Sequence, residues 1–172
     1  MDKSYMSGFN LFSDKRVLNT IEVGHLYQSI ESNIFGMEMM TGFAQAAQDS
    51  EVKEYFNKGI ELSQKIIREL NEEFKESDIQ MPSTSAGKAT KSTTSPFSDK
   101  LMLYNTNLVG TFAIGSNIIG GAFSFRSDLP AKLALLSIEI FAYTKEGGKI
   151  MVQNKWMEEP PQMENRAETK KI

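Results

Sequence analysis

Residues 78–97 read DIQMPSTSAGKATKSTTSPF, and this segment decides how the rest of the chain folds. It is rich in Ser, Thr, Lys and Gly, includes Pro82 and Pro96, and lacks apolar periodicity, which is typical of a loop. Loops of this length are uncommon inside compact domains and need a structural reason. About 20 extended residues reach roughly 66 Å, whereas a helix of about 28 residues is roughly 42 Å long. The segment can therefore run the full length of a helical bundle.

The apolar spacing predicts two long helices before this loop and two after it. Together they make an all-α four-helix bundle. If the loop spans the bundle, the third helix starts beside the start of the second, which is the ferritin-like arrangement with a long crossover. A flexible loop between two antiparallel helices is the alternative. We predict helices over 20–47, 51–77, 99–125 and 129–157 in a single bundle (19–161), with an N-terminal arm (1–18), a crossover linker (78–98) and a polar C-terminal tail (162–172).

Capping residues mark where each predicted helix begins, because their side chains accept hydrogen bonds from the free N–H groups of a first turn. A proline pair stops the last helix, since proline cannot continue it. The signals are Asn19 or Thr20, Asp49 with Ser50, Ser98 with Asp99, Ser127 with Asp128, and finally Pro160 with Pro161.

The third predicted helix carries no charged residue between Leu101 and Phe125. Its length would suffice for a membrane span, but asparagines at 105, 107 and 117 would be costly in a bilayer. We therefore predict a helix buried at the centre of the bundle, with membrane or interface association as the alternative. Its glycines, at 110, 115, 120 and 121, each weaken a helix by about 1 kcal/mol. Close contact with a neighbouring helix is the expected compensation, and a cavity for a small apolar ligand is the alternative.

The overall composition argues against several classes of function. The net charge of −3 and the lack of a basic cluster beyond Lys170 and Lys171 disfavour nucleic-acid binding. The chain contains no cysteine, which excludes disulfides, thiolate catalysis and cysteine metal sites. Because the sequence also shows no phosphate-binding loop or nucleophile elbow, we expect no enzyme activity and no cofactor.

One pair of residues has the spacing of a metal-binding motif. Glu22 and His25 lie at i and i+3, a pair that ferritin-like di-iron sites use twice. His25 is the only histidine, and the third helix offers no carboxylate between Leu101 and Phe125. We therefore predict no di-iron site and keep Glu22 and His25 as weak metal-binding candidates. A surface or interface role is the expected one for His25.

Glu139 stands in an apolar stretch of the fourth predicted helix. A buried carboxylate with a raised pKa could be functional. We expect instead that Glu139 flanks the core and reaches water or a lysine.

A second apolar set on the first predicted helix indicates an interface. Phe35, Met39 and Phe43 lie on a different face from the stripe that includes Ile30 and Ile34. We predict that these three residues contribute to a homo-oligomer, in the simplest case a dimer, or to contacts with other proteins.

Several stretches together resemble a known family. They are TIEVGHLY (20–27), LSQK (62–65), FSDKLMLY (97–104), RSD (126–128) and Pro160-Pro161. The chain resembles an uncharacterised helical family of endospore-forming bacteria, often described as similar to spore coat protein F. The resemblance covers about 19–161, and many members carry two such bundles in tandem. It implies a ferritin-like bundle, a role in the spore and other coat proteins as the alternative partners to a second copy, and it implies no catalytic residues. The chain departs from the family in lacking a tryptophan near Tyr27.

The function that we expect is that of a non-enzymatic structural or interaction protein, associated with the spore coat or sporulation. The alternative is a ferritin-like binding protein for a metal ion or a small apolar ligand. The N-terminus has no apolar run long enough for a signal peptide, so we expect a cytoplasmic protein, with the spore coat as the location that the resemblance implies.

Overall fold

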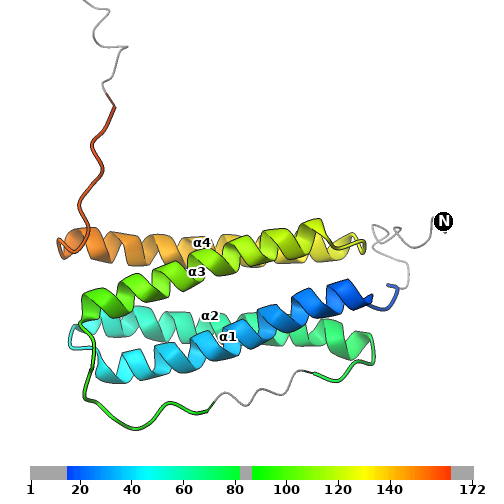
Figure 1. The fold of residues 1–172 in the computed structure, drawn as a ribbon, viewed down its shortest axis with the longest axis horizontal. Helices are drawn as coiled ribbons and strands as arrows, with labels where there is room; N and C mark the ends of the chain where they lie inside the picture. The colour runs from blue at the N-terminus through cyan, green and yellow to red at the C-terminus, as the bar shows by residue number, and fades with distance from the viewer. Residues whose placement is uncertain (1–14, 82–86, 164–172) are drawn as a thin grey trace, which may run out of the picture.

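A computed structural model describes residues 15–81 and 87–163, and within these ranges the chain is all-α. Its four helices are α1 (Thr20–Ala46), α2 (Ser50–Glu76), α3 (Asp99–Ala122) and α4 (Asp128–Gln153) (Figure 1). The predicted four-helix bundle is therefore confirmed.

Three of the predicted caps close the helix starts. The Asn19 side chain accepts from the Glu22 N–H, and the Glu22 carboxylate accepts from the Asn19 N–H, which makes a capping box at α1. Asp49 accepts from two N–H groups at the start of α2, and Ser98 accepts from the Leu101 N–H in α3. Ser127 precedes α4 but makes no capping hydrogen bond through its side chain.

The last two helices end earlier than the sequence predicts. α3 stops at Ala122 rather than near Phe125, because the N–H groups of Phe125 and Arg126 donate to the Glu22 carboxylate at 3.0 and 2.9 Å. α4 stops at Gln153 rather than near Met157. There Lys155 takes a left-handed conformation with φ of 58°, and the Trp156 N–H turns back to the Met151 carbonyl at 2.7 Å.

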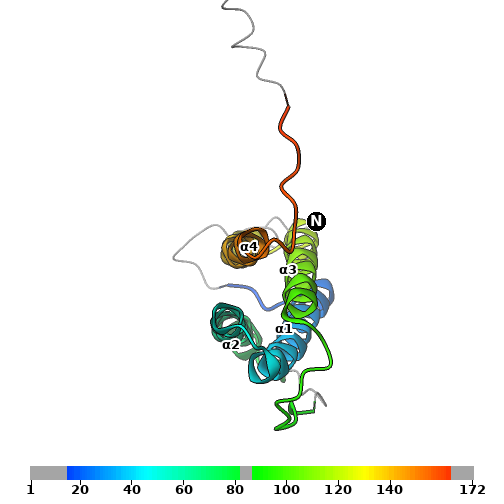
Figure 2. The ribbon, with the colours of Figure 1, turned by 90° about the vertical axis from the view of Figure 1, so that its left-hand side faces the viewer.

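The four helices form two antiparallel hairpins that lie against each other (Figures 1 and 2). One hairpin is α1 with α2, and the other is α3 with α4. The described residues of the segment between the hairpins, 77–81 and 87–98, lie along the bundle, where the Ala89 N–H donates to Glu38 at 3.0 Å. α3 therefore starts beside the α1–α2 turn, and the Asp99 carboxylate accepts from the N–H groups of Gln48 and Asp49. The predicted crossover is present, and it is compatible with the ferritin-like arrangement.

The apolar core consists of two clusters toward opposite ends of the bundle. Leu26, Ile30, Ile66, Leu70, Phe74, Leu129, Leu133 and Leu136 belong to the first. Met40, Val52, Tyr55, Phe56, Met102, Leu103, Ile150 and Met151 belong to the second. Leu18 is buried in the first cluster, so the described end of the N-terminal arm packs on the bundle.

Between α2 and α4 a pair of stacked tyrosines takes the space that two glycines leave. The rings of Tyr55 and Tyr143 lie 4.3 Å apart with an interplanar angle of 4°. A Cβ atom at Gly59 would overlap Tyr143, and one at Gly147 would overlap the Tyr55 hydroxyl and Asn107. The missing side chains therefore let these two helices approach closely.

We expect Gly147→Ala to destabilise the protein by about 1–3 kcal/mol, because the added methyl group overpacks the tyrosine pair. Gly148→Ala is the matched control, since no atom lies within 4 Å of the position of its Cβ. It should gain up to about 1 kcal/mol from helix propensity. Denaturant unfolding measures both, and equal stability of the two variants would contradict the overlap.

The structure corrects the prediction that the third helix is buried. One face of α3 packs against α4, but the opposite face has no partner within the described chain. Apolar residues with half or more of their area exposed include Leu101, Tyr104, Phe112, Ile118, Ile119 and Phe123. The uncharged stretch of α3 therefore marks an apolar surface and not a buried position. No helix in the described residues is long and apolar enough to cross a membrane.

Candidate functional site

The structure uses the two metal-binding candidates in other ways. Glu22 is fully buried, and its carboxylate accepts from Arg16 at 2.7 and 2.9 Å as well as from three backbone N–H groups. His25 stacks on Phe123 with the ring centroids 6.2 Å apart. Within the described residues there is no group of three or more His, Asp or Glu side chains that could hold a metal ion.

Glu139 pairs with a lysine, as the sequence predicts. The Lys65 ammonium group lies 2.6 Å from the Glu139 carboxylate, at the partly exposed border between α2 and α4. This contact is one of the polar links between the two hairpins.

The three predicted interface residues differ in exposure. Phe35 is 67% exposed. Met39 and Phe43 are only partly exposed, and Phe43 packs on Phe56 with the ring centroids 5.5 Å apart. A role of these residues in an interface stays a prediction that rests mainly on Phe35.

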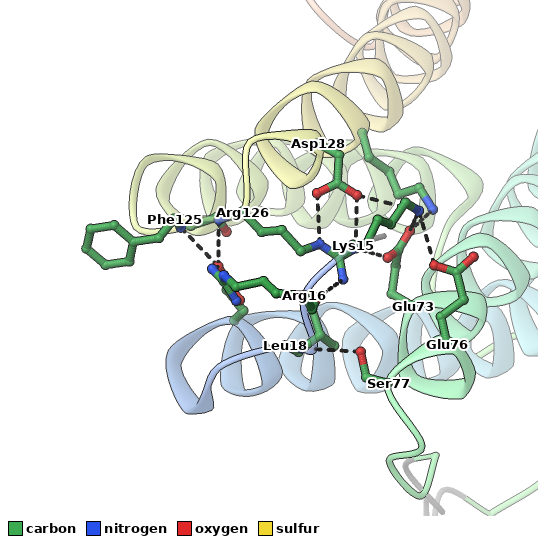
Figure 3. A network of polar contacts seen from close by, with 12 residues as sticks. Lys15, Arg16, Leu18, Glu73, Glu76, Ser77, Phe125, Arg126 and Asp128 are labelled. Carbon is green, nitrogen blue, oxygen red and sulfur yellow. Dashed lines mark hydrogen bonds and ion pairs between the residues drawn. The ribbon is translucent and has the colours of Figure 1, made fainter. Parts of the chain in front are cut away.

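A cluster of buried charges joins the two hairpins where the α3–α4 turn meets the start of α1 and the end of α2 (Figure 3). Arg126 is 2% exposed, and its guanidinium group contacts Glu73 and donates to Asp128 at 2.8 and 2.9 Å. Lys132 contacts the other oxygen of Glu73. Together with Arg16 and Glu22, these residues form what we name the charge cluster.

The carboxylates of the charge cluster stay ionised because their partners outweigh the cost of burial. Burial raises the pKa of Glu22, but hydrogen bonds from Arg16 and from the N–H groups of Asn19 and Arg126 lower this pKa to about 2. Burial also raises the pKa of Glu73, and Lys132 and Arg126 hold it below its ordinary value. The buried carboxylates of the cluster therefore each have cationic partners and hydrogen-bond donors that favour the ionised form.

Sequence reasoning missed most of the charge cluster, although a signal for Glu73 is present. Glu73 lies three residues after Leu70 and seven after Ile66, so helical spacing places it on the apolar stripe of α2. A carboxylate at such a position requires a cationic partner. The partner, Arg126, is distant in sequence and could not be identified from spacing alone.

A cavity of about 540 Å³ opens between the two hairpins, and all four helices line it. The charge cluster holds the hairpins together at one end, and the contacts of Asp99 hold them at the other. The described residues that line the cavity include no Asp, Glu, Lys or Arg. Its walls combine apolar side chains such as Leu62, Ile66 and Ile140 with small and polar ones such as Gly36, Ser63 and Asn117. This volume lies in the range of small-molecule sites.

The fold and this site define an all-α four-helix bundle with a long crossover and an uncharged cavity between its hairpins. The chain belongs to the family described as "Protein of unknown function (DUF3231)", whose model matches residues 6–169. No curated protein matches it in sequence.

A solved structure shares the fold. It is the crystal structure of a "putative spore coat protein" from Bacillus halodurans C-125, with a TM-score of 0.76 and 14% identity over 87% of this chain and 98% of that chain. At this identity the similarity shows the fold alone. The two findings confirm the predicted resemblance to an uncharacterised helical family of spore-forming bacteria.

Proposed function

We propose that this protein is a non-enzymatic structural protein that self-associates and takes part in the spore coat or in sporulation. The observation that carries the proposal is an apolar face on the α3–α4 hairpin. The similarity in fold to a protein that is named for the spore coat supports a role in the coat or in sporulation.

The apolar face consists of exposed side chains at helical spacing on both helices of one hairpin. Each is between 42% and 63% exposed: Leu101, Tyr104, Leu108, Ile118, Leu135, Ile138 and Phe141. If each leaves on the order of 100 Å² uncovered, the face offers roughly 700 Å², close to the ~800 Å² that each partner buries in a stable interface. It also exceeds the ~300–600 Å² of the largest patch on a typical monomer.

The distribution of charge favours a second copy of the chain as the partner. None of these seven side chains carries a charge, and Lys145, which lines the same hollow as Tyr104 and Phe141, can extend its ammonium group to water. Two copies of the face can therefore meet with little desolvation of ions. The ion pairs between α2 and α4, such as Lys58 with Glu146, lie where this hairpin borders α2. A two-fold dimer places one such patch against itself.

We expect the full chain to sediment as a dimer or larger oligomer, and Ile138→Glu to raise the dissociation constant at least tenfold. The added carboxylate would be buried in the interface without a partner, and each tenfold change corresponds to about 1.4 kcal/mol. In the monomer the substitution replaces an exposed side chain, so the fold should be kept. Sedimentation velocity over a range of concentrations measures the change.

Phe35→Glu is the matched control, because Phe35 is equally exposed but lies on α1. Phe35 also carries the interface that the sequence predicts on α1. If the α3–α4 face forms the contact instead, Phe35→Glu should leave the dissociation constant unchanged. A monomer at high concentration would contradict self-association, whereas an effect of Phe35→Glu alone would place the interface on α1 instead.

The proposed setting has its own test. A fluorescent fusion expressed from the native promoter should collect around the developing spore. A uniform signal in vegetative cells would contradict the role in the coat without bearing on self-association.

A further inference from the structure

The cavity between the hairpins carries an inference beyond self-association. We propose that it binds an uncharged, elongated and largely apolar molecule that carries a hydroxyl or carbonyl oxygen, such as a long-chain alcohol or a neutral lipid chain. The shape of the cavity, its lack of charge and its polar groups each support this ligand class.

The cavity is long and narrow. Its lining runs along α1 from His25 to Met40 and along α3 from Thr106 to Ile119. At 1.5 Å per residue both stretches are about 20 Å long. A volume of about 540 Å³ over that length forms a channel that suits a chain rather than a globular ligand.

A buried glycine lines the cavity on α1. Gly36 is buried, yet no atom lies within 4 Å of the position of its Cβ. In contrast, a Cβ at Gly59 or Gly110 would overlap neighbouring side chains. Gly36 therefore leaves space open along the wall that α1 contributes to the channel.

Buried polar groups in the lining can bind an oxygen of the ligand. Asn117 is 5% exposed, and its carbonyl oxygen accepts from Ser29, but within the described chain its NH₂ group has no hydrogen-bond partner. Ser63 is 7% exposed and also lines the cavity. Neither the Asn117 nitrogen nor the Ser63 hydroxyl is among the sealed, unpartnered atoms of the described chain, so both are open to the cavity and can donate to an oxygen of a ligand.

The described lining holds no Asp, Glu, Lys or Arg, and its one basic side chain, His25, stands at one end of the stretch on α1, so the rest of the channel disfavours an ionised head group. A carboxylate placed there would lose its hydration without gaining a cation. A long-chain alcohol should therefore bind better than the carboxylate of the same length.

The test uses the neutral dye N-phenyl-1-naphthylamine, whose fluorescence reports an apolar site, with displacement by 1-decanol and by decanoate. We expect the full chain to bind the dye, 1-decanol to displace it, and decanoate at pH 8 to do so at least tenfold more weakly. A chain that shows no displaceable dye binding, or that binds decanoate as tightly as 1-decanol, would overturn the proposal.

Gly36→Leu should weaken the binding of dye and alcohol at least tenfold, because the new side chain fills the channel. It should also raise the Tm by about 2–4 °C through helix propensity, so loss of binding cannot be attributed to unfolding. Gly148→Leu, outside the lining, should raise the Tm similarly and keep binding. Undiminished binding by Gly36→Leu would overturn the site.

Ser63→Ala tests the polar contact separately. It should weaken the binding of 1-decanol severalfold and leave the binding of the dye unchanged, because the dye has no hydroxyl group. Binding should persist in Ile138→Glu, so a failure of the ligand site and a failure of self-association can be distinguished.

Discussion

Arg126→Met should lower the free energy of unfolding by about 3–5 kcal/mol, the range found when one partner of a buried ion pair is removed. The methionine keeps much of the length of the side chain, so the loss is mainly that of charge and hydrogen bonds. Glu73, at 1% exposure, and Asp128 would lose the guanidinium group that both contact. Lys132 still contacts Glu73, which favours the lower part of the range. Denaturant unfolding at neutral pH measures the change.

Arg68→Met is the matched control, because Arg68 is exposed on α2. Its effect should lie within about 0.5 kcal/mol. A double-mutant cycle with Glu73→Gln should give a coupling energy of about 1 kcal/mol or more, as for residues of one network. If Arg126→Met is no more destabilising than Arg68→Met, the charge cluster does not hold the hairpins together.

The sequence predicts local features of this bundle well, because short-range physics determines them. The capping residues Asn19, Asp49 and Ser98 mark the helix starts, since the groups that they satisfy lie within three residues. The crossover follows from the length of the 78–97 segment, which is compared directly with the length of a helix.

Features that depend on distant partners could not be predicted in the same way. The end of α3 is set by Glu22, about a hundred residues earlier in the chain. An uncharged helix can face a core or form an apolar surface, and sequence alone does not say which of its faces has a partner. The cavity depends on where the hairpins separate, and so on the contacts that hold both their ends. The glycines of α3 indicated a cavity only as an alternative to close packing.

The two sets of end contacts give the cavity a physical explanation. At one end the charge cluster joins α1, α2 and the α3–α4 turn, and at the other end Asp99 of α3 binds the α1–α2 turn. Between them, Ser29 and Asn117 link α1 with α3 by a hydrogen bond of 3.3 Å. The hairpins can therefore stay apart along the channel without losing their mutual orientation. On this basis a variant that weakens the charge cluster should also weaken binding in the channel.

The charge cluster should also make the protein sensitive to acid. The pKa of Glu22 is about 2 in the folded protein, against an ordinary value of 4.5, so the unfolded chain binds the proton first as the pH falls. The contribution of Glu22 to stability is thus complete above about pH 5 and is lost between about pH 4.5 and 2. This difference between the Glu22 pKa values of the folded and the unfolded chain corresponds to about 3 kcal/mol in the free energy of unfolding. Glu73 and Asp128, whose pKa values are also lowered, act in the same direction.

Glu22→Gln should therefore cost about 3 kcal/mol at pH 7 and should flatten the dependence of stability on pH below 5. Glutamine keeps the shape of the side chain, but it gives Arg16 no charge and offers one oxygen in place of two to the N–H groups of Asn19, Phe125 and Arg126. Glu61→Gln, at an exposed position on α2, is the control and should retain the wild-type profile. Unfolding curves at pH 7, 5, 4 and 3 measure both variants. If the free energy of unfolding of Glu22→Gln falls with pH in parallel to that of the wild type, the acid sensitivity arises elsewhere. Glu22, the most deeply buried carboxylate at the junction of the hairpins, would then not be the group that titrates.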